Sequence, residues 1–286
     1  MIIGVDIGGS HITAAFIDEQ AITVVPGTTA RRHINAKGTA EEILNTWYET
    51  IHEVRAAQKG MISGIGIAMP GPFDYARGIS LIKGHDKYDA LYQLDIGAAL
   101  ASRLGIDTAC IRFRNDAEAF LLGEMSSGAG TGYKRGIGIT LGTGLGSAVH
   151  VPGCTWDAER WGYPFLGDIA EESISTRWFV RRYQELTGNR VKDTKELADM
   201  VTTDQAAAAV FREFSNNLGS FLKDFIRDEQ PEVVILGGNI ANAWDIFYPD
   251  MAVMLDEELK TVVIRKAALG EDAALIGGGC CWLKPE

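Results

Sequence analysis

Two neighbouring residues, Asn115 and Asp116, carry the clearest signal for chemistry in this sequence. They follow an apolar run that predicts a strand over residues 106–113 and precede a helical pattern that begins at residue 117. A carboxylate at the end of a strand, beside an amide that donates and accepts hydrogen bonds, suits a general base acting on a hydroxyl group. The alternative is that one of these side chains only caps the helix, as Asn and Asp often do.

Three glycine-rich turns each follow a predicted strand. They are Asp6 to Ser10 with Gly8 and Gly9, then Gly142-Thr143-Gly144, and finally Gly237-Gly238. Glycine lets the backbone approach an anion closely, Ser10 and Thr143 add hydroxyl groups, and the Asp6 carboxylate can hold a hydrated Mg²⁺. A single glycine turn is usually only a tight turn, but three in this order predict binding of phosphate groups.

The type of phosphate site can be narrowed further. The sequence contains no GxxxxGK[ST] motif, which excludes a Walker A loop, and no GxGxxG opening a first βαβ unit, which disfavours a Rossmann dehydrogenase. Phosphoryl transfer to a hydroxyl group needs in-line positioning, neutralised charge and a carboxylate base. The glycine turns together with Asp116 are typical of that reaction.

The composition bounds the class of protein. The chain has 286 residues, enough for two lobes, and 46% of them are hydrophobic. A formal net charge of −11 without a Lys/Arg-rich block argues against a nucleic-acid partner. The four cysteines form no CxxC pair, and we see neither a signal peptide nor a membrane-spanning stretch. We therefore expect a cytoplasmic protein without a membrane partner.

An internal repeat indicates two related halves. The alternating pattern at residues 2–17 predicts a β-hairpin, and residues 3–8 align with residues 137–142 at almost every apolar and glycine position. In the same register, residues 13–15 fall on residues 147–149. A helix should begin at Thr39, where Glu42 completes a capping box. We also expect helices over residues 95–104, 175–186, 205–227 and 272–283, and strands over residues 61–69 and 232–236.

The motifs DIGGSH, NDAEAF, LGTGLGSA and LGGN, in this order, resemble those of the ROK sugar kinases of the actin/hexokinase superfamily. The resemblance implies an α/β fold of two actin-like (ribonuclease H-like) lobes with a ligand cleft between them. It implies that ATP and Mg²⁺ are bound and that a hexose or N-acetylhexosamine is phosphorylated at O6. Asp116 would be the general base, and Asn115 would bind the sugar. We expect an N-terminal lobe of residues 1–115, with the helix of residues 271–286 packing back on it, a C-terminal lobe of residues 116–270, and a homodimer.

The sequence departs from the family pattern in three places. The usual GExGH segment and the CxCGxxGC zinc motif are both missing, so we predict no structural zinc. Glu159 and Glu171 stand near the positions of the family's two sugar-binding glutamates, and His85 lies where the family presents a sugar-facing loop. His11 replaces the family's usual Lys beside the first glycine turn.

Two alternatives stay open at this point. The first is a non-catalytic sugar-binding or regulatory protein on the same scaffold. An intact Asp116 argues against it, and the first glycine turn begins too early in the chain to leave room for a preceding DNA-binding domain. The second alternative concerns the donor, because inorganic polyphosphate would use the same anion-binding turns as ATP.

Overall fold

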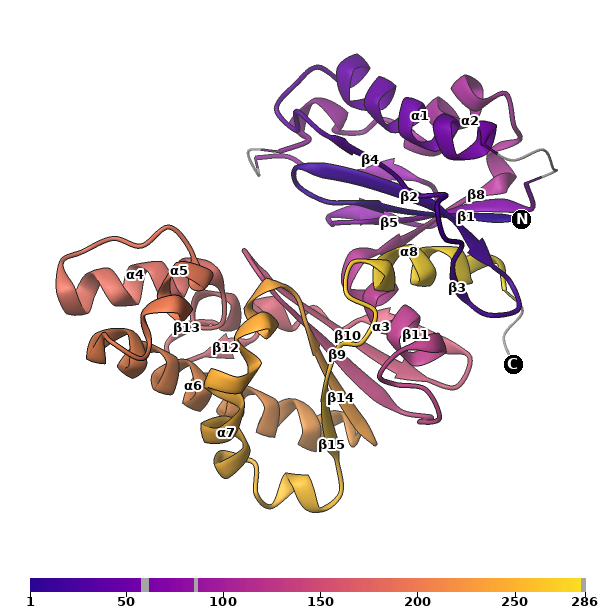
Figure 1. Ribbon diagram of the computed structural model, residues 1–286. Coiled ribbons are helices and arrows are strands. Elements are labelled where there is room, and N and C mark those ends of the chain that lie inside the picture. The colour runs from indigo at the N-terminus through magenta and orange to yellow at the C-terminus, as the bar shows by residue number, and fades with distance from the viewer. Residues whose placement is uncertain (58–61, 85–86, 284–286) are drawn as a thin grey trace. The chain divides into compact units, whose positions relative to one another are not determined.

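The computed structural model describes residues 1–57, 62–84 and 87–283, and the chain forms two compact units (Figure 1). The first unit contains Met1–Thr131 and Glu271–Glu286, and the second contains Gly132–Gly270. Each unit is built around one main β-sheet with helices packed against it.

The sheet of the first unit has the order β3-β2-β1-β5-β8, with β4 paired to β2. Strands β1 and β2 form an antiparallel hairpin, whereas β5 runs parallel to β1 and β8 runs parallel to β5. The carboxyl ends of β1, β5 and β8 therefore meet at one edge of the sheet. The strands are β1 (Ile2–Ile7), β2 (His11–Asp18), β3 (Thr23–Val24), β4 (Ala30–His33), β5 (Gly64–Met69) and β8 (Ile111–Asn115), with a small separate hairpin of β6 (Phe73–Asp74) and β7 (Ile79–Ser80).

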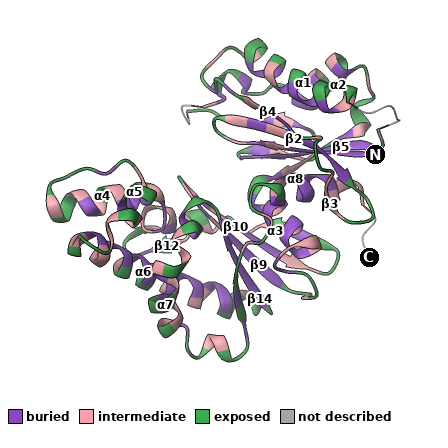
Figure 2. Ribbon diagram, in the orientation of Figure 1, coloured by how far each residue is buried: buried purple, intermediate pink, exposed green. Residues whose placement is uncertain are grey.

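Helix α1 (Ala40–Ala56) begins as the sequence predicts. Thr39 and Glu42 form the capping box, and the face of the helix that carries Trp47 and Ile51 is buried in the core of the first unit (Figure 2). Helix α2 (Ile96–Leu104) is capped by Asp95 and ends at Gly105, whose φ of 61° suits a glycine.

Helix α8 (Asp272–Gly279) approaches the sheet of the first unit unusually closely. A Cβ atom at Gly66 would lie 1.9 Å from the carbonyl oxygen of Gly278, and one at Gly277 would lie 1.8 Å from the carbonyl oxygen of Ala119. Glycines at these positions let α8 pack on β1 and β5 and let α3 (Asp116–Ser127) pack on α8. Because α3 packs there, the chain divides after Thr131 rather than after residue 115.

The sheet of the second unit repeats the topology of the first. Its order is β11-β10-β9-β14-β15, with an antiparallel hairpin of β9 and β10 followed by two parallel strands. This repetition confirms the two related α/β lobes. The strands are β9 (Gly136–Leu141), β10 (Leu145–Val151), β11 (Cys154–Asp157), β14 (Val233–Gly237) and β15 (Val263–Lys266), with a separate hairpin of β12 (Pro164–Phe165) and β13 (Asp168–Ile169).

The register of the repeat differs from the alignment by one residue in the second strand. Ile7 pairs with Ile12 in the first hairpin, which leaves four residues between them, whereas Leu141 pairs with Leu145 in the second, which leaves three. The shorter turn means that Thr13 corresponds to Gly146 and not to Ser147. The sequence alignment rests on the first strand of each hairpin, so it does not reveal that one residue is missing from the second turn.

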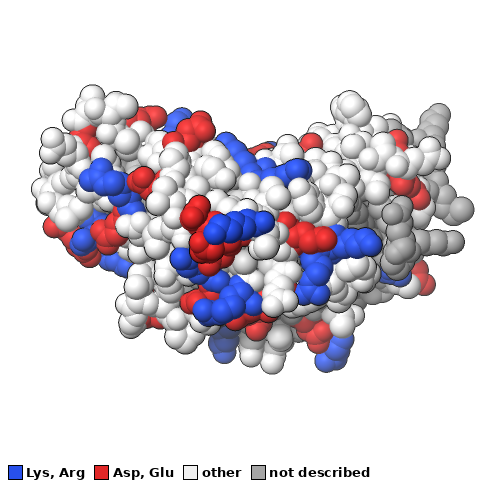
Figure 3. Space-filling view, turned by 90° about the horizontal axis from the view of Figure 1, so that it is seen from below, with Lys and Arg blue, Asp and Glu red and all other residues white. Residues whose placement is uncertain are grey.

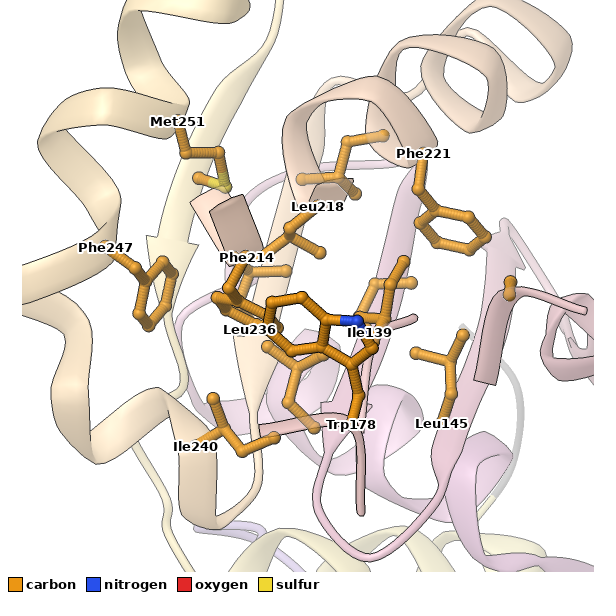
Figure 4. Close-up of a cluster of buried hydrophobic side chains, with 14 of the residues drawn as sticks. Ile139, Leu145, Trp178, Phe214, Leu218, Phe221, Leu236, Ile240, Phe247 and Met251 are labelled. Carbon is orange, nitrogen blue, oxygen red and sulfur yellow. The ribbon is translucent and has the colours of Figure 1, made fainter. Parts of the chain in front are cut away.

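Aromatic and aliphatic side chains together fill the core of the second unit (Figure 4). Phe214 on the long helix α6 stands edge-on to Phe247 on α7, with 5.5 Å between the ring centroids. Trp178 comes from α4, and Ile139 and Leu236 come from the central strands. The helices of this unit are α4 (Thr176–Thr187), α5 (Thr194–Met200), α6 (Gln205–Glu229) and α7 (Trp244–Met254).

Two boundaries differ from the sequence prediction for local reasons. Residues 106–110 do not extend β8, because the Asp107 carboxylate accepts a hydrogen bond from the Ala109 N–H and starts a 3-10 turn, η2 (Thr108–Cys110). The C-terminal α-helix stops at Gly279 and continues as the 3-10 turn η7 (Cys280–Trp282).

None of the described helices combines the length and apolarity that a membrane span requires.

Charged side chains of both signs lie next to one another on the face shown in Figure 3. The ion pairs of the second unit include Arg182 with Glu213, with 2.8 Å between Nε and Oε2. Mixed surface charge of this kind fits the sequence-based argument against a nucleic-acid partner.

Candidate functional site

The first glycine turn and the Asn115-Asp116 pair come to the same edge of the first sheet. Asp6 lies opposite Ala68 of β5, and Asn115 lies opposite Met69 in the parallel ladder between β5 and β8. The sequence predicts both features separately, and the parallel strands bring them together.

Asn115 caps helix α3. Its Oδ1 accepts hydrogen bonds from the N–H groups of Ala117, at 2.8 Å, and Glu118, at 3.2 Å. Its Nδ2 donates to the Tyr75 hydroxyl at 3.2 Å, and its side chain belongs to a residue only 7% exposed. The capping interpretation is therefore correct for Asn115, and the next carboxylate, Asp116, is left on the first turn of the helix.

The Asp116 side chain is accessible to solvent, and the surrounding protein shifts the pKa of its carboxyl group. The residue is exposed, and its Oδ1 accepts a hydrogen bond from the Ala117 N–H at 2.9 Å. Desolvation raises the pKa of the Asp116 carboxyl above its ordinary value, although the Ala117 N–H and the charge of Lys87 act in the opposite direction. A raised pKa strengthens a carboxylate as a proton acceptor.

Asp6 is the second perturbed carboxyl group at this edge. Burial, followed by repulsion from Asp116 and Glu271, raises the pKa of Asp6 to about 7, while Arg31 opposes the shift. Arg31 itself forms an ion pair with Glu271. Because Asp6 lies opposite Ala68 and Asp116 follows Asn115 at the end of the neighbouring ladder, this edge of the sheet brings the two carboxyl groups together.

The first glycine turn is held by a tyrosine that the sequence does not mark. The Gly8 N–H donates to the His11 carbonyl at 2.9 Å, and the Tyr88 hydroxyl donates to the Gly8 carbonyl. The Tyr88 ring is fully buried and stands edge-on to Trp47 at 5.5 Å. Burial and then the charge of Asp6 raise the pKa of Tyr88, so the hydroxyl remains a donor. A lone Tyr in a polar segment gives no sequence signal for this contact.

His11 and its surroundings complete the description of the first turn. Its Nδ1 lies 2.9 Å from the Ser10 hydroxyl, and its ring stands edge-on to His33 at 5.2 Å. His85, which the sequence assigns to a sugar-facing loop, lies outside the described residues.

The second and third glycine turns meet at one edge of the second sheet. The Gly142 N–H donates to the Gly144 carbonyl at 3.0 Å, and the Thr176 N–H at the start of α4 donates to the Gly142 carbonyl at 2.8 Å. Gly237 lies opposite Thr140 in the parallel ladder. Gly238 has a φ of 83°, and a Cβ there would lie 2.4 Å from the Leu141 carbonyl oxygen. Only glycine permits this contact between the two turns.

Glu171 contacts the second glycine turn directly. It lies in the 3-10 turn η4 (Ala170–Glu172), and its Oε2 accepts a hydrogen bond from the Leu145 N–H at 3.0 Å. Its Oε1 lies 2.5 Å from Nη2 of Arg177. The carboxylate that the resemblance assigns to the sugar is thus already bonded to the backbone beside the turn.

Comparison with known proteins decides the family. The model of the ROK family matches residues 2–160 and 166–284. The chain belongs to the ROK family. The unmatched residues 161–165 lie in the segment where the sequence lacks the zinc motif.

Several similar proteins have named activities. A glucokinase from Thermotoga maritima is 25% identical over 311 aligned positions, which cover 96% of this chain and 95% of that protein. An N-acetyl-D-glucosamine kinase from Pectobacterium carotovorum is 24% identical, with 97% of each chain covered. The structure of a ROK glucokinase from Streptomyces griseus in complex with glucose and AMPPNP matches with a TM-score of 0.77 at 22% identity, covering 98% of each chain.

Glu159 has a different environment from Glu171 in this ROK protein. It is exposed, its φ is 51°, and its N–H donates to Asp157 Oδ1 at 2.8 Å. The next residue, Arg160, donates its N–H to the Ser147 hydroxyl and forms an ion pair with Asp228 at 2.8 Å. Within the described part of the second unit, no hydrogen bond or ion pair joins Glu159 to the glycine turns, so its role in sugar binding stays a prediction.

Residues 1–57, 62–84 and 87–283 contain no group of three or more His, Cys, Asp or Glu side chains that could hold a metal ion. All four cysteines are free thiols; Cys154 is exposed, whereas Cys110, Cys280 and Cys281 are half-buried. The expected absence of zinc stays a prediction, which elemental analysis of the purified protein tests.

Proposed function

We propose that this ROK protein is an ATP-dependent sugar kinase that phosphorylates a hexose or N-acetylhexosamine at O6. The observation that carries the proposal is the exposed Asp116 carboxylate, which begins α3 at the sheet edge that also holds Asp6 and the first glycine turn. The glucokinase and N-acetyl-D-glucosamine kinase relatives support the choice of sugar acceptor.

Asp116 acts as the general base in this proposal. It accepts the proton of the sugar hydroxyl as the new bond to phosphorus forms, and the raised pKa matches this role. Asn115 positions it, because the cap made by the Asn115 side chain fixes the first turn of α3. The Nδ2 of Asn115, oriented by Tyr75, is the group proposed to contact the sugar.

The residues present fit ATP and Mg²⁺. The repulsion that raises the pKa of Asp6 marks an excess of negative charge that a divalent cation offsets. Asp6 would hold Mg²⁺ through a bound water, and the cation would neutralise charge on the donor phosphates. Nothing lies within 4 Å of a Cβ placed at Gly142, so the backbone there is open to a phosphate group. Gly8, Gly9, Ser10, Thr143, Gly144, Gly237 and Gly238 are the further proposed contacts to ATP.

A phosphorylation screen tests the proposal. Glucose, mannose, N-acetylglucosamine and N-acetylmannosamine are each incubated with ATP and Mg²⁺, with the Asp116→Asn variant as control. We expect transfer to at least one sugar by the wild type only, with the phosphate found on O6 by NMR. Sugar binding without transfer would favour the non-catalytic alternative. The homodimer and the cytoplasmic location stay predictions.

A further inference from the structure

A pocket of about 550 Å³ lies in the first unit, at the outer edge of its sheet. It is lined by Ile111 to Arg114 of β8, by the turn between β6 and β7, and by residues of α2 and η2. Successive residues of a strand point to opposite faces of a sheet, so a pocket that touches all four follows the edge of β8, the last strand of this sheet. Pockets that bind small molecules usually measure roughly 300–1,000 Å³, so a ligand of metabolite size fits.

Two glycines leave room for an aromatic wall in this pocket. Gly78 has a φ of 71°, and a Cβ there would lie 2.9 Å from Cε2 of Phe113. A Cβ at Gly97 would lie 3.5 Å from the same atom. The rings of Phe113 and Tyr75 therefore line the pocket beside two residues that have no side chain.

The charge of the pocket is positive. Arg77 comes from the turn between β6 and β7, and Arg112 and Arg114 come from β8. No carboxylate is among the described residues that line the pocket, and neither is any residue proposed to contact ATP or the sugar. In a protein of net charge −11, such a cluster reverses the local sign of the charge.

Arg112 is held in place by neutral groups. Its Nη1 donates to the Cys281 carbonyl at 2.5 Å, and its guanidinium lies over the Trp282 ring, 4.1 Å from the ring centroid. Within the described part of the chain, no carboxylate lies within ion-pair distance of Arg112. The bond to Cys281 uses one of the five N–H donors of the guanidinium, so an oriented cation with further donors lies at the pocket.

The other two arginines are only partly compensated. Arg77 Nη1 lies 4.0 Å from Asp74 Oδ2, and the Arg77 side chain is 74% exposed, so this pair contributes little. Arg114 pairs with Glu118, and its Nε donates to the Cys281 Sγ at 3.5 Å. Three guanidinium groups thus have two carboxylate partners, and an excess of positive charge is left for an anion.

We propose that this pocket is an effector site that binds a small phosphate monoester. Guanidinium groups bind phosphate oxygens in pairs, and arginines from two different segments match the charge of a phosphate dianion. The rings of Phe113 and Tyr75 suit the organic part of such a ligand. The chemistry proposed for Asp116 and the glycine turns uses none of the arginines of this pocket.

Arg114 links the pocket to the start of α3. Its partner Glu118 lies in the first turn of that helix and donates its N–H to Asn115 Oδ1. Tyr75, which lines the pocket, accepts a hydrogen bond from Asn115 Nδ2. A phosphate that draws Arg114 away from Glu118 therefore loosens the helix start and should weaken sugar binding. This effect on the sugar rests on the proposed function, whereas phosphate binding in the pocket does not.

Calorimetry without nucleotide tests the site, with ribose 5-phosphate, inorganic phosphate and uncharged ribose as separate probes. Phosphorylation of a hexose neither uses nor makes ribose 5-phosphate. The pocket variant is Arg77→Gln/Arg112→Gln, and the matched control is Arg32→Gln/Arg103→Gln, which removes two surface arginines of the same unit whose ion pairs lie outside the pocket. We expect at least tenfold weaker binding of ribose 5-phosphate in the pocket variant only, and equal behaviour of both variants towards ribose.

Glu118→Gln tests the link to α3. The variant removes the carboxylate that competes for Arg114, so ribose 5-phosphate should bind at least threefold more tightly than to wild type. Titrations of glucose and N-acetylglucosamine, each with and without ribose 5-phosphate, measure the effect on the sugar. In wild type we expect the phosphate to weaken sugar binding at least threefold, and in Glu118→Gln we expect no such dependence.

Each outcome decides the proposal. Weaker binding in the pocket variant alone supports the site, and an equal loss for inorganic phosphate identifies free phosphate as a sufficient ligand. Equal binding by the pocket and control variants, or no binding by wild type, overturns the site even if the protein phosphorylates a sugar. Sugar affinity that is independent of bound phosphate overturns the effector role.

Two further outcomes separate the site from the proposed function and from folding. A protein that binds ribose 5-phosphate in the pocket but neither sugar supports the site and rejects the proposed function. If the double variant fails to fold, Arg77→Gln alone is measured against Arg103→Gln.

Discussion

The carboxylate of Glu171 accepts a hydrogen bond from the backbone N–H of Leu145, with 3.0 Å between Oε2 and the nitrogen. Leu145 is the first residue of β10 and follows the second glycine turn directly. A Cβ at Gly144 would lie 2.6 Å from the same Oε2, so the contact requires glycine in the turn. The glycine turn is therefore shaped by an acidic side chain from a different segment of the second unit.

Replacing Glu171 by Ala should lower the free energy of unfolding by about 1–3 kcal/mol, because a partly buried N–H loses its acceptor. Urea unfolding measures the change. Glu172→Ala is the matched control, since its exposed ion pairs with Arg177 and Arg181 should contribute only about 0–1 kcal/mol. Equal losses in the two variants would show that the contact with Leu145 has no structural importance.

Replacing Asp116 by Asn should lower kcat at least a hundredfold while the fold and sugar binding persist. The fold should persist because the cap of α3 is made by Asn115, not by Asp116. Steady-state kinetics and sugar calorimetry measure the two effects. Asp107→Asn, which changes an exposed capping carboxylate elsewhere in the first unit, should keep normal turnover. Near-normal kcat in the Asp116 variant would reject its assignment as the base.

Much of the fold could be predicted because local signals agreed with the global structure. The capping box at Thr39 and Glu42 lies where the sequence places it, and helix α2 ends at Leu104 as the sequence predicts. The exact pairing in the second hairpin could not be predicted, because it depends on a turn that is one residue shorter. The packing of α3 against α8 could not be predicted either, because it depends on the close approach of Gly277 to Ala119.

The candidate site was predictable where its residues follow strand ends, as Asp6 and Asn115 do. It was not predictable where a contact joins distant segments. The Tyr88 hydroxyl donates to the Gly8 carbonyl although the two residues are 80 positions apart in the chain, and no local sequence pattern predicts that hydrogen bond.

Two substitutions at Asn115 should separate its capping role from its proposed contact with the sugar. Asn115→Ala should destabilise the protein by about 1 kcal/mol, because α3 loses its cap. Asn115→Asp keeps a capping oxygen but loses the Nδ2 donor, so stability should change little while the KM for the sugar rises at least tenfold. Urea unfolding and kinetics measure the two effects. An unchanged KM in Asn115→Asp would restrict Asn115 to capping.

The last prediction concerns the dependence of stability on pH. The pKa of Asp6 rises from its ordinary value of 3.8 to about 7 in the folded protein. Between these two pH values the folded state holds a proton that the unfolded state has released, so the free energy of unfolding falls as pH rises through this window. Asp6→Asn removes this effect. The variant should therefore gain stability relative to wild type as pH increases from about 4 to about 7, and the difference should level off above it.

Urea unfolding in magnesium-free buffer across this pH range measures the difference between wild type and Asp6→Asn. Asp18→Asn supplies a control of opposite sign, because the N–H groups of Ala21 and Gln20 lower the pKa of Asp18. Its ionised form stabilises the folded state at every pH above the ordinary value of 3.8, so this variant should be less stable than wild type by a constant amount across the range. That difference should disappear only as the pH falls below 3.8. A difference for Asp6→Asn that stays constant from acidic to neutral pH would mean that Asp6 is already ionised throughout. In that case the negative charge at the sheet edge would be greater than proposed, and the repulsion from Asp116 and Glu271 would have to be offset by Arg31.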